Sequence, residues 1–256
     1  MVFTHGVNPY GFAYCRRTNE DNVDLNRNFH YSWSEPRTLA PEYATLDPLL
    51  NPSGPPSRFD PFRFKALWQI RRHGLTTLKS AVAGGQYLFP RGLFYGGRLI
   101  TQSTQTVMRH LANWVGSAER VLHVDLHTGL GRFGQHRLLL EEPVGSPAAQ
   151  WYRDRLGSTT VEPAGTPAAT TYRATGTLGA WAQRALPRVR YRFATAEFGT
   201  YSMLRVLGAL RAENQAHFYA AWHSSCQRRA KEELRECFCP RSTRWQEDVI
   251  AGGLEL

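Results

Sequence analysis

Apolar side chains recur at helical spacing in three stretches of the chain. They return every three or four positions over residues 61–82, 102–115 and 203–223, although Gly74 interrupts the first stretch. This spacing places apolar side chains on one face of a helix, so we expect helices there. Residues 227–236 are rich in charge and predict a further helix. It should end before Pro240, because the residue preceding a proline disfavours helical geometry.

Short runs with a strand-like pattern alternate with these helical stretches. Residues 120–127, 136–142 and 189–198 form three such runs. Residues 2–7 also favour a strand, which should end at the turn signals Asn8-Pro9 and Tyr10-Gly11. Strands that alternate with helices predict the α/β class.

Two segments between these elements predict loops. Residues 34–60 are rich in proline, which favours an extended surface excursion or a lid over a helix. Residues 84–97 combine glycines with aromatic side chains, which favours a loop where the backbone approaches another group closely. The pattern leaves open whether that group is a substrate or the protein itself.

Composition predicts one packed domain over residues 1–256. The chain is 42% hydrophobic and 12% aromatic, which is enough apolar surface to offset the entropy lost on ordering. Its formal net charge is +10, and nearly all of the positive charge is arginine. Basic residues are scattered among acidic ones and form no recognisable nucleic-acid module, so we expect no nucleic-acid partner.

Cysteine usage and hydropathy predict a cytoplasmic protein. The four cysteines, Cys15, Cys226, Cys237 and Cys239, form no C-x-x-C pair and are expected to be reduced thiols. The N-terminus lacks the basic and apolar regions of a signal peptide, and no run of about 18 apolar residues occurs. We therefore expect no membrane partner.

A long motif near the N-terminus points to a family. Asn8-Pro9-Tyr10-Gly11-Phe12 is followed by Arg16-Arg17-Thr18-Asn19 and by Val23-Asp24-Leu25-Asn26-Arg27-Asn28-Phe29. This segment resembles the part of zinc carboxypeptidases that grips the substrate carboxylate, and it is most similar to the bacterial domain-of-unknown-function 2817 group. The resemblance implies an α/β fold, a mixed-sheet α/β/α sandwich of the zinc carboxypeptidase type.

The resemblance assigns substrate-binding roles to several residues. Asn26 and Arg27 would bind the terminal carboxylate of a small peptide or an acylated amino acid, because the arginine fork matches a carboxylate bidentately. Arg16 would polarise the scissile carbonyl, with Arg17 as the alternative. Tyr172 lies in residues 172–181, which resemble the mobile segment whose tyrosine closes over the bound peptide.

Two further motifs resemble the catalytic centre of the family. His127, in Asp125-Leu126-His127-Thr128-Gly129, matches the third zinc ligand. Glu197, in Thr195-Ala196-Glu197-Phe198-Gly199, matches the carboxylate that deprotonates water and passes the proton to the leaving amine. Asp125 and His123 share the strand face of His127, so either could support that ligand.

The family's other two zinc ligands come from a His-x-x-Glu motif, and no His-x-x-Glu occurs in this chain. Because catalytic zinc normally needs three protein ligands, the sequence favours an N-terminally truncated domain with impaired zinc binding. Three hypotheses follow: a zinc-dependent carboxypeptidase-like hydrolase in a shortened form, a catalytically dead carboxylate-binding relative, and a basic protein that binds through charge alone. The sequence does not separate a peptidase from an amidase.

Overall fold

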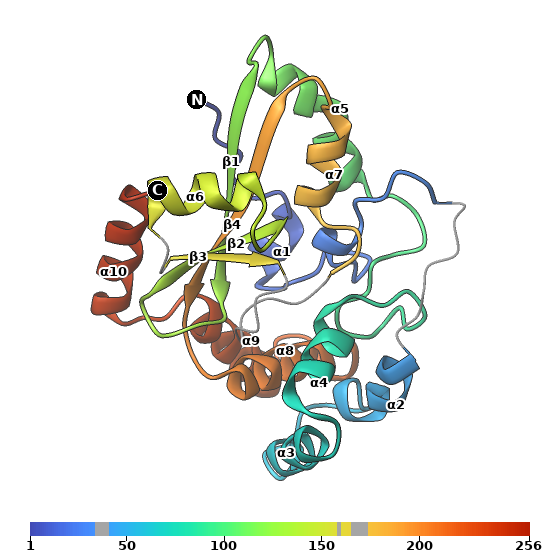
Figure 1. The fold of residues 1–256 in the computed structure, drawn as a ribbon. Coiled ribbons are helices and arrows are strands. Elements are labelled where there is room, and N and C mark those ends of the chain that lie inside the picture. The colour runs from blue at the N-terminus through green and yellow to red at the C-terminus, as the bar shows by residue number, and fades with distance from the viewer. Residues whose placement is uncertain (34–40, 158–159, 165–173) are drawn as a thin grey trace. The chain divides into compact units, whose positions relative to one another are not determined.

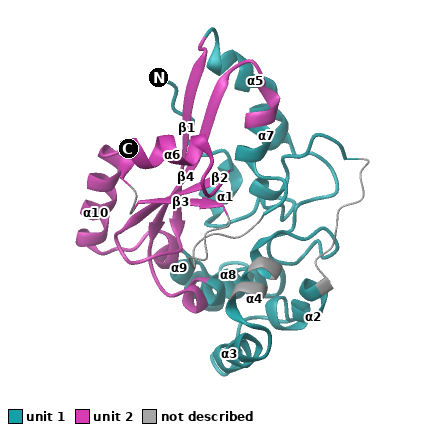
Figure 2. Ribbon diagram, in the orientation of Figure 1, with its two compact units in different colours: residues 1–117, 172–182, 207–234 teal, residues 118–171, 183–206, 235–256 magenta. Residues whose placement is uncertain are grey.

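The computed structural model describes residues 1–33, 41–157, 160–164 and 174–256. These residues divide into two compact units, each assembled from three segments of the chain (Figure 2). Unit 1 comprises residues 1–117, 172–182 and 207–234, and unit 2 comprises residues 118–171, 183–206 and 235–256. The expectation of a single domain stays a prediction.

Unit 2 is built on a four-stranded mixed sheet in the order β1-β4-β2-β3 (Figure 1). Strand β1 pairs in parallel with β4, β4 pairs antiparallel with β2, and β2 pairs in parallel with β3. The strands are β1 Arg120–Gly129, β2 His136–Pro143, β3 Val161–Ala164 and β4 Arg190–Gly199. The expected α/β class with a mixed sheet flanked by helices is therefore confirmed.

The core of unit 2 lies on one face of this sheet. Side chains of β2 and β4 that alternate along the strands point to that face, including Leu138, Ala194 and Phe198. Helices α6 (Pro147–Leu156) and α10 (Thr243–Leu254) cover it, with Tyr152 of α6 fully buried. The side chains one position along each strand point to the opposite face, where His123, Asp125 and His127 of β1 and Glu197 of β4 lie.

Unit 1 is mainly helical. Its elements include α1 (Pro9–Tyr14), the 3₁₀ turn η1 (Leu25–Arg27), α2 (Pro41–Leu50), α3 (Phe62–His73), α4 (Leu75–Ala83) and α5 (Gln102–Val115). Three further helices begin in one unit and end in the other: α7 (Leu178–Ala185), α8 (Met203–Tyr219) and α9 (Ser225–Phe238). Within unit 1, α3 contacts α4 and α2 (Figure 1).

The first predicted strand is wrong, and capping chemistry explains why. Residues 2–7 form no strand, and the Asn8-Pro9 signal starts helix α1. Asn8 is the N-cap, and its side chain accepts a hydrogen bond from the Gly11 amide at 2.9 Å. Pro9 occupies the first turn, where a missing N–H leaves no helical hydrogen bond unmade.

Two other sequence-based boundaries need correction. The expected loop at 34–60 contains α2, and its residues 34–40 lie outside the described residues. The expected helix at 61–82 is divided into α3 and α4 at Gly74, whose φ of +81° suits glycine and ends the first helix. The chain also forms α6, β3, α7 and α10, which the hydrophobic pattern did not predict.

All four cysteines are free thiols, as expected. None of the helices in the described part of the chain is both long and apolar enough to cross a lipid bilayer.

Candidate functional site

His127 and Glu197 lie side by side at the carboxyl ends of two neighbouring strands of unit 2. His127 on β1 is the direct parallel partner of Glu197 on β4. The Nδ1 atom of His127 lies 3.9 Å from Oε2 of Glu197. The His127 side chain is 32% exposed and that of Glu197 is 9% exposed, so the imidazole is the more accessible of the two. The sequence-based placement of both residues at strand ends is confirmed.

Asp125 holds the imidazole of His127 from the same strand face. Its Oδ2 lies 2.9 Å from Nε2 of His127, and the carboxylate accepts this hydrogen bond. Burial alone would raise the pKa of Asp125, but the charge and hydrogen bond of His127, together with the charge of His123, hold it below its usual value. Asp125 therefore orients His127 and directs Nδ1 towards Glu197.

The backbone of the loop after β1 holds one carboxylate oxygen of Glu197. Its Oε1 accepts a hydrogen bond from the backbone amide of Leu130 at 2.8 Å, which leaves Oε2 on the His127 side. The glycine two residues after Glu197 has a steric reason. A Cβ at Gly199 would lie 2.1 Å from the carbonyl oxygen of Arg132, so any larger residue there would displace the loop that carries Leu130.

His123 packs against two aromatic residues of β4. Its Nδ1 lies 2.7 Å from the hydroxyl of Tyr191, and its ring packs edge-on against Phe193 at 4.8 Å. Burial lowers the pKa of His123, and the nearby charge of Asp125 acts in the opposite direction. Of the two residues weighed as supports for His127, Asp125 is the one in contact with it.

The zinc expected from the resemblance lacks a complete ligand set in the described residues. His127 offers one imidazole nitrogen. However, no group of three or more His, Cys, Asp or Glu side chains within these residues is arranged to hold a metal ion. Catalytic zinc sites normally have three protein ligands and one open position. The described side chains alone therefore do not fit a catalytic zinc.

In unit 1, the Asn26-Arg27 pair lies on η1. Asp24 caps this turn and accepts a hydrogen bond from the Asn26 amide. Arg27 is 1% exposed, and its Nε and Nη2 donate to the carbonyl oxygen of Ala83 at 3.0 and 2.6 Å. The loop closes tightly over this side chain, because a Cβ at Gly85 would lie 2.7 Å from Cδ of Arg27. Arg27 is thus enclosed by backbone.

Asn26 is the more accessible member of the pair. It is only partly buried, and its Oδ1 accepts a hydrogen bond from the Leu178 amide at 2.9 Å, which leaves the two donors of its side-chain amide facing away from that bond. Thr175, three residues earlier, donates its backbone N–H to the carbonyl of Gly84. The segment that follows Tyr172 is therefore attached beside Asn26, whereas Tyr172 itself lies outside the described residues.

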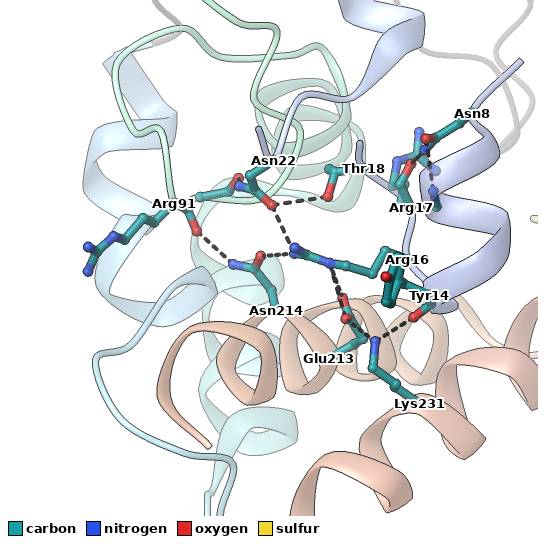
Figure 3. A network of polar contacts seen from close by, with 12 residues as sticks. Asn8, Tyr14, Arg16, Arg17, Thr18, Asn22, Arg91, Glu213, Asn214 and Lys231 are labelled. Atoms are coloured by element: carbon teal, nitrogen blue, oxygen red, sulfur yellow. Dashed lines mark hydrogen bonds and ion pairs between the residues drawn. The ribbon is translucent and has the colours of Figure 1, made fainter. Parts of the chain in front are cut away.

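Arg16 forms the centre of a buried polar network in unit 1 (Figure 3). Its side chain is 1% exposed, and its Nε lies 3.2 Å from Oε1 of Glu213. Its Nη2 donates to the side-chain oxygens of Asn22 and Asn214 at 3.0 and 3.2 Å. Lys231 approaches Oε1 of Glu213 at 3.1 Å from the other side. The guanidinium of Arg16 is thus committed to the protein interior.

Arg17 is the more accessible of the two arginines. Its side chain is 28% exposed, and its Nε donates to Oδ2 of Asp24 at 2.9 Å. The guanidinium also lies over the ring of Phe94, 5.0 Å from its centroid. Burial would raise the pKa of Asp24, but the charges of Arg17 and Arg27 keep it lowered. Arg17 is therefore fixed by the same motif that carries Asn26 and Arg27.

Sequence reasoning did not identify the partners of Arg16. Glu213 and Asn214 lie on α8 in the mainly polar run Arg211–Gln215 of a helix whose other residues are mostly apolar. Both are at most 5% exposed. A cluster of polar residues inside an apolar helical pattern was the available signal, because buried polar groups need partners.

The family model described as "Protein of unknown function (DUF2817)" matches residues 1–252. The chain belongs to this family. No curated protein and no solved structure matches the chain.

Proposed function

We propose that this member of the DUF2817 family is a carboxypeptidase-like hydrolase that acts on a peptide or amide bond next to a terminal carboxylate. The observation that carries the proposal is the pairing of Glu197 with His127, with Asp125 orienting the imidazole at 2.9 Å. The motif of residues 8–29, which resembles the carboxylate-gripping segment of zinc carboxypeptidases, supports the substrate class. The cytoplasm is the proposed location.

In this proposal Glu197 is the general base. Its Oε1 accepts the Leu130 amide and its Oε2 lies 3.9 Å from Nδ1 of His127, so we assign the proton transfer to Oε2. Oε2 takes a proton from water while the water oxygen bonds to the scissile carbonyl carbon. The same proton then passes to the leaving nitrogen as the C–N bond breaks. Zinc, the cofactor expected of the resembled family, would make such a water more acidic, with His127 as one ligand. No step is assigned to it, because the described residues do not complete its ligand set.

Unit 1 supplies the proposed substrate-binding residues. The part-exposed amide of Asn26 is suited to donate to a substrate carboxylate, and Arg27 behind it adds positive charge. Tyr172 keeps its proposed role as the cap, and the hydrogen bond from the Leu178 amide to Asn26 supports this role by holding residues 174–178 near Asn26.

We assign the carbonyl-polarising role to Arg17 in place of Arg16. The register of the motif favours Arg16, but a guanidinium that is 1% exposed and bonded to Glu213 is not available to a substrate. Arg17 is part-exposed and held in place by Asp24, as a cation that stabilises a developing oxyanion needs to be.

Hydrolysis of N-acylated dipeptides with a free C-terminal carboxylate, in zinc-containing buffer, tests the proposal. Glu197→Gln should lower kcat by at least about 100-fold, the usual effect of removing a general base. Glu119→Gln is the matched control, because Glu119 is an exposed carboxylate of the same unit. Arg17→Ala should reduce kcat by about 100-fold or more. Equal rates for the Glu197 and Glu119 variants would contradict the assignment.

A catalytically dead carboxylate-binding protein is the second candidate. It is favoured by the lack of a three-ligand metal group within the described residues. Zinc per chain, measured by elemental analysis after dialysis, separates the two. About one zinc that is lost in His127→Asn supports the hydrolase. No retained zinc and no turnover, with carboxylate-dependent dipeptide binding that Asn26→Ala weakens, supports the binding protein.

A further inference from the structure

Helix α3 has apolar side chains on two opposite faces. Phe62 and Ala66, each 6% exposed, form the face that packs against unit 1. The ring of Phe62 lies beneath the guanidinium of Arg211, 5.0 Å from its centroid, and next to Gly208 of α8. This face fixes the helix on the rest of unit 1 and so determines which side chains point outward.

The outward face carries large apolar side chains that project far from the protein. Phe64 is 79% exposed, Leu67 is 51% exposed and Trp68 is 55% exposed. Phe59, just before the helix, is 94% exposed. We call these four residues the α3 ridge. Single exposed apolar residues are common, but Phe64, Leu67 and Trp68 share one outward face of a helix, as expected of an interaction surface.

Positive charge surrounds the α3 ridge. Five exposed cations lie between residues 58 and 72: Arg58, Arg63, Lys65, Arg71 and Arg72. The one carboxylate of this segment, Asp60, is paired with Arg211 at 2.6 Å and so does not offset them. At 100° per residue, the helical cations flank the apolar stripe, and Arg71 lies within it. The guanidinium of Arg72 lies 5.3 Å from the centroid of Trp68.

We propose that the α3 ridge docks unit 1 onto the surface of an anionic lipid bilayer. Aromatic and leucine side chains enter the boundary between headgroups and acyl chains, and flanking arginines stay with the lipid phosphates. Clustered Lys and Arg bind anionic headgroups electrostatically, and the bilayer accepts projecting apolar groups without a matching concave surface. Self-association through the α3 ridge would place the five cations of one copy against the five cations of the other, and this repulsion disfavours a dimer. This proposal replaces the sequence-based expectation of no membrane partner, and it is independent of the proposed hydrolase activity.

Flotation with vesicles tests the proposal. The whole chain should bind vesicles of phosphatidylcholine mixed with phosphatidylglycerol, bind phosphatidylcholine vesicles weakly, and be released by salt. The double variant Phe64→Ser/Trp68→Ser should lower the partition coefficient at least tenfold. Arg71→Gln/Arg72→Gln should lower it by about fivefold for each charge removed.

Matched variants exclude a general loss of apolar surface or charge. Phe12 and Trp222 belong to the same unit and are 73% and 56% exposed, close to the values for Phe64 and Trp68. Phe12→Ser/Trp222→Ser should therefore leave vesicle binding unchanged. Arg228→Gln/Arg229→Gln removes two exposed charges from α9 and serves as the charge control. Circular dichroism should show the same thermal midpoint for the two ridge variants as for the unmodified chain.

Three results would overturn the proposal. The first is the absence of binding to vesicles that contain phosphatidylglycerol. The second is binding that the Phe64/Trp68 variant retains in full, because charge alone would then explain it. The third is a loss in the control variants as large as that in the ridge variants. Binding to RNA or to polyglutamate without binding to vesicles would likewise assign the surface to another class of partner.

Discussion

The network around Arg16 in unit 1 and the cluster around His127 in unit 2 use similar residue types in opposite ways. Arg16 is bonded to Glu213, Asn22 and Asn214 and is almost completely buried. His127 is one-third exposed, is bonded to Asp125, and lies 3.9 Å from Glu197. Residue type does not separate a polar cluster that stabilises the fold from one that is available for chemistry. The burial of the side chains and the number of their hydrogen bonds do.

The largest effect expected from this comparison concerns Glu213. Glu213→Ala should lower the free energy of unfolding by about 3–5 kcal/mol, because it leaves the buried charge of Arg16 without its carboxylate partner. Urea denaturation measures the change. Asp248→Ala is the control, since Asp248 is 42% exposed and 3.9 Å from Arg244, and it should change stability by less than about 0.5 kcal/mol. A loss below about 1 kcal/mol in Glu213→Ala would show that the network is not structural.

A second prediction concerns the pH dependence of stability at His217, which lies near the charges of the Arg16 network. Burial, with the charges of Arg16 and Lys231, lowers the pKa of His217 from 6.5 to about 4. The unfolded chain therefore binds this proton near pH 6.5, whereas the folded chain binds it only near pH 4. Stability should fall as pH drops through this window, because the unfolded state then holds more protons.

His217→Gln removes this titration. The decrease in urea midpoint between pH 7 and pH 5 should be smaller in this variant than in the unmodified chain. An unchanged decrease would mean that carboxylates elsewhere account for the whole pH dependence, and that the charges near Arg16 do not act on His217.

Within the two clusters, the smallest effect on stability is expected at Glu197. Glu197→Gln keeps an Oε1 acceptor for the Leu130 amide, so the free energy of unfolding should change by no more than about 1 kcal/mol. Urea denaturation of this variant, beside Glu213→Ala, compares the two clusters directly. A loss of several kcal/mol would place Glu197 with the structural residues and remove the contrast.

The sequence predicted elements whose pattern is local. Helix α5 was expected at 102–115 and occupies these residues, because Thr101 caps its start and Gly116 ends it. The runs that became β1, β2 and β4 were placed to within two residues. Strand β3 escaped notice because it has only four residues and contains Pro163. Helix α10 carries Gly252 and Gly253, which disfavour a helix in isolation.

Tertiary packing explains what the local pattern could not. Gly252 lets α10 approach the sheet, since a Cβ there would lie 2.6 Å from Nδ1 of His136. For the candidate site, the motifs placed His127 and Glu197 at strand ends, and the register of β1 and β4 made them neighbours. No local pattern distinguishes Arg16 from Arg17, because the buried partner of Arg16 is 197 residues away along the chain. The roles of these residues stay predictions.

The assembly of each unit from three distant segments has a consequence for synthesis. Unit 1 needs residues 207–234 and unit 2 needs residues 235–256, so neither can be completed before these segments have left the ribosome. Arg16 emerges 197 residues before Glu213. At usual translation rates the interval is about 10 to 40 s, far longer than the formation of a helix. During this time the nascent chain holds the Arg16 cation without its carboxylate partner and leaves apolar side chains of both units unburied, which is the state in which a chain is most prone to aggregate.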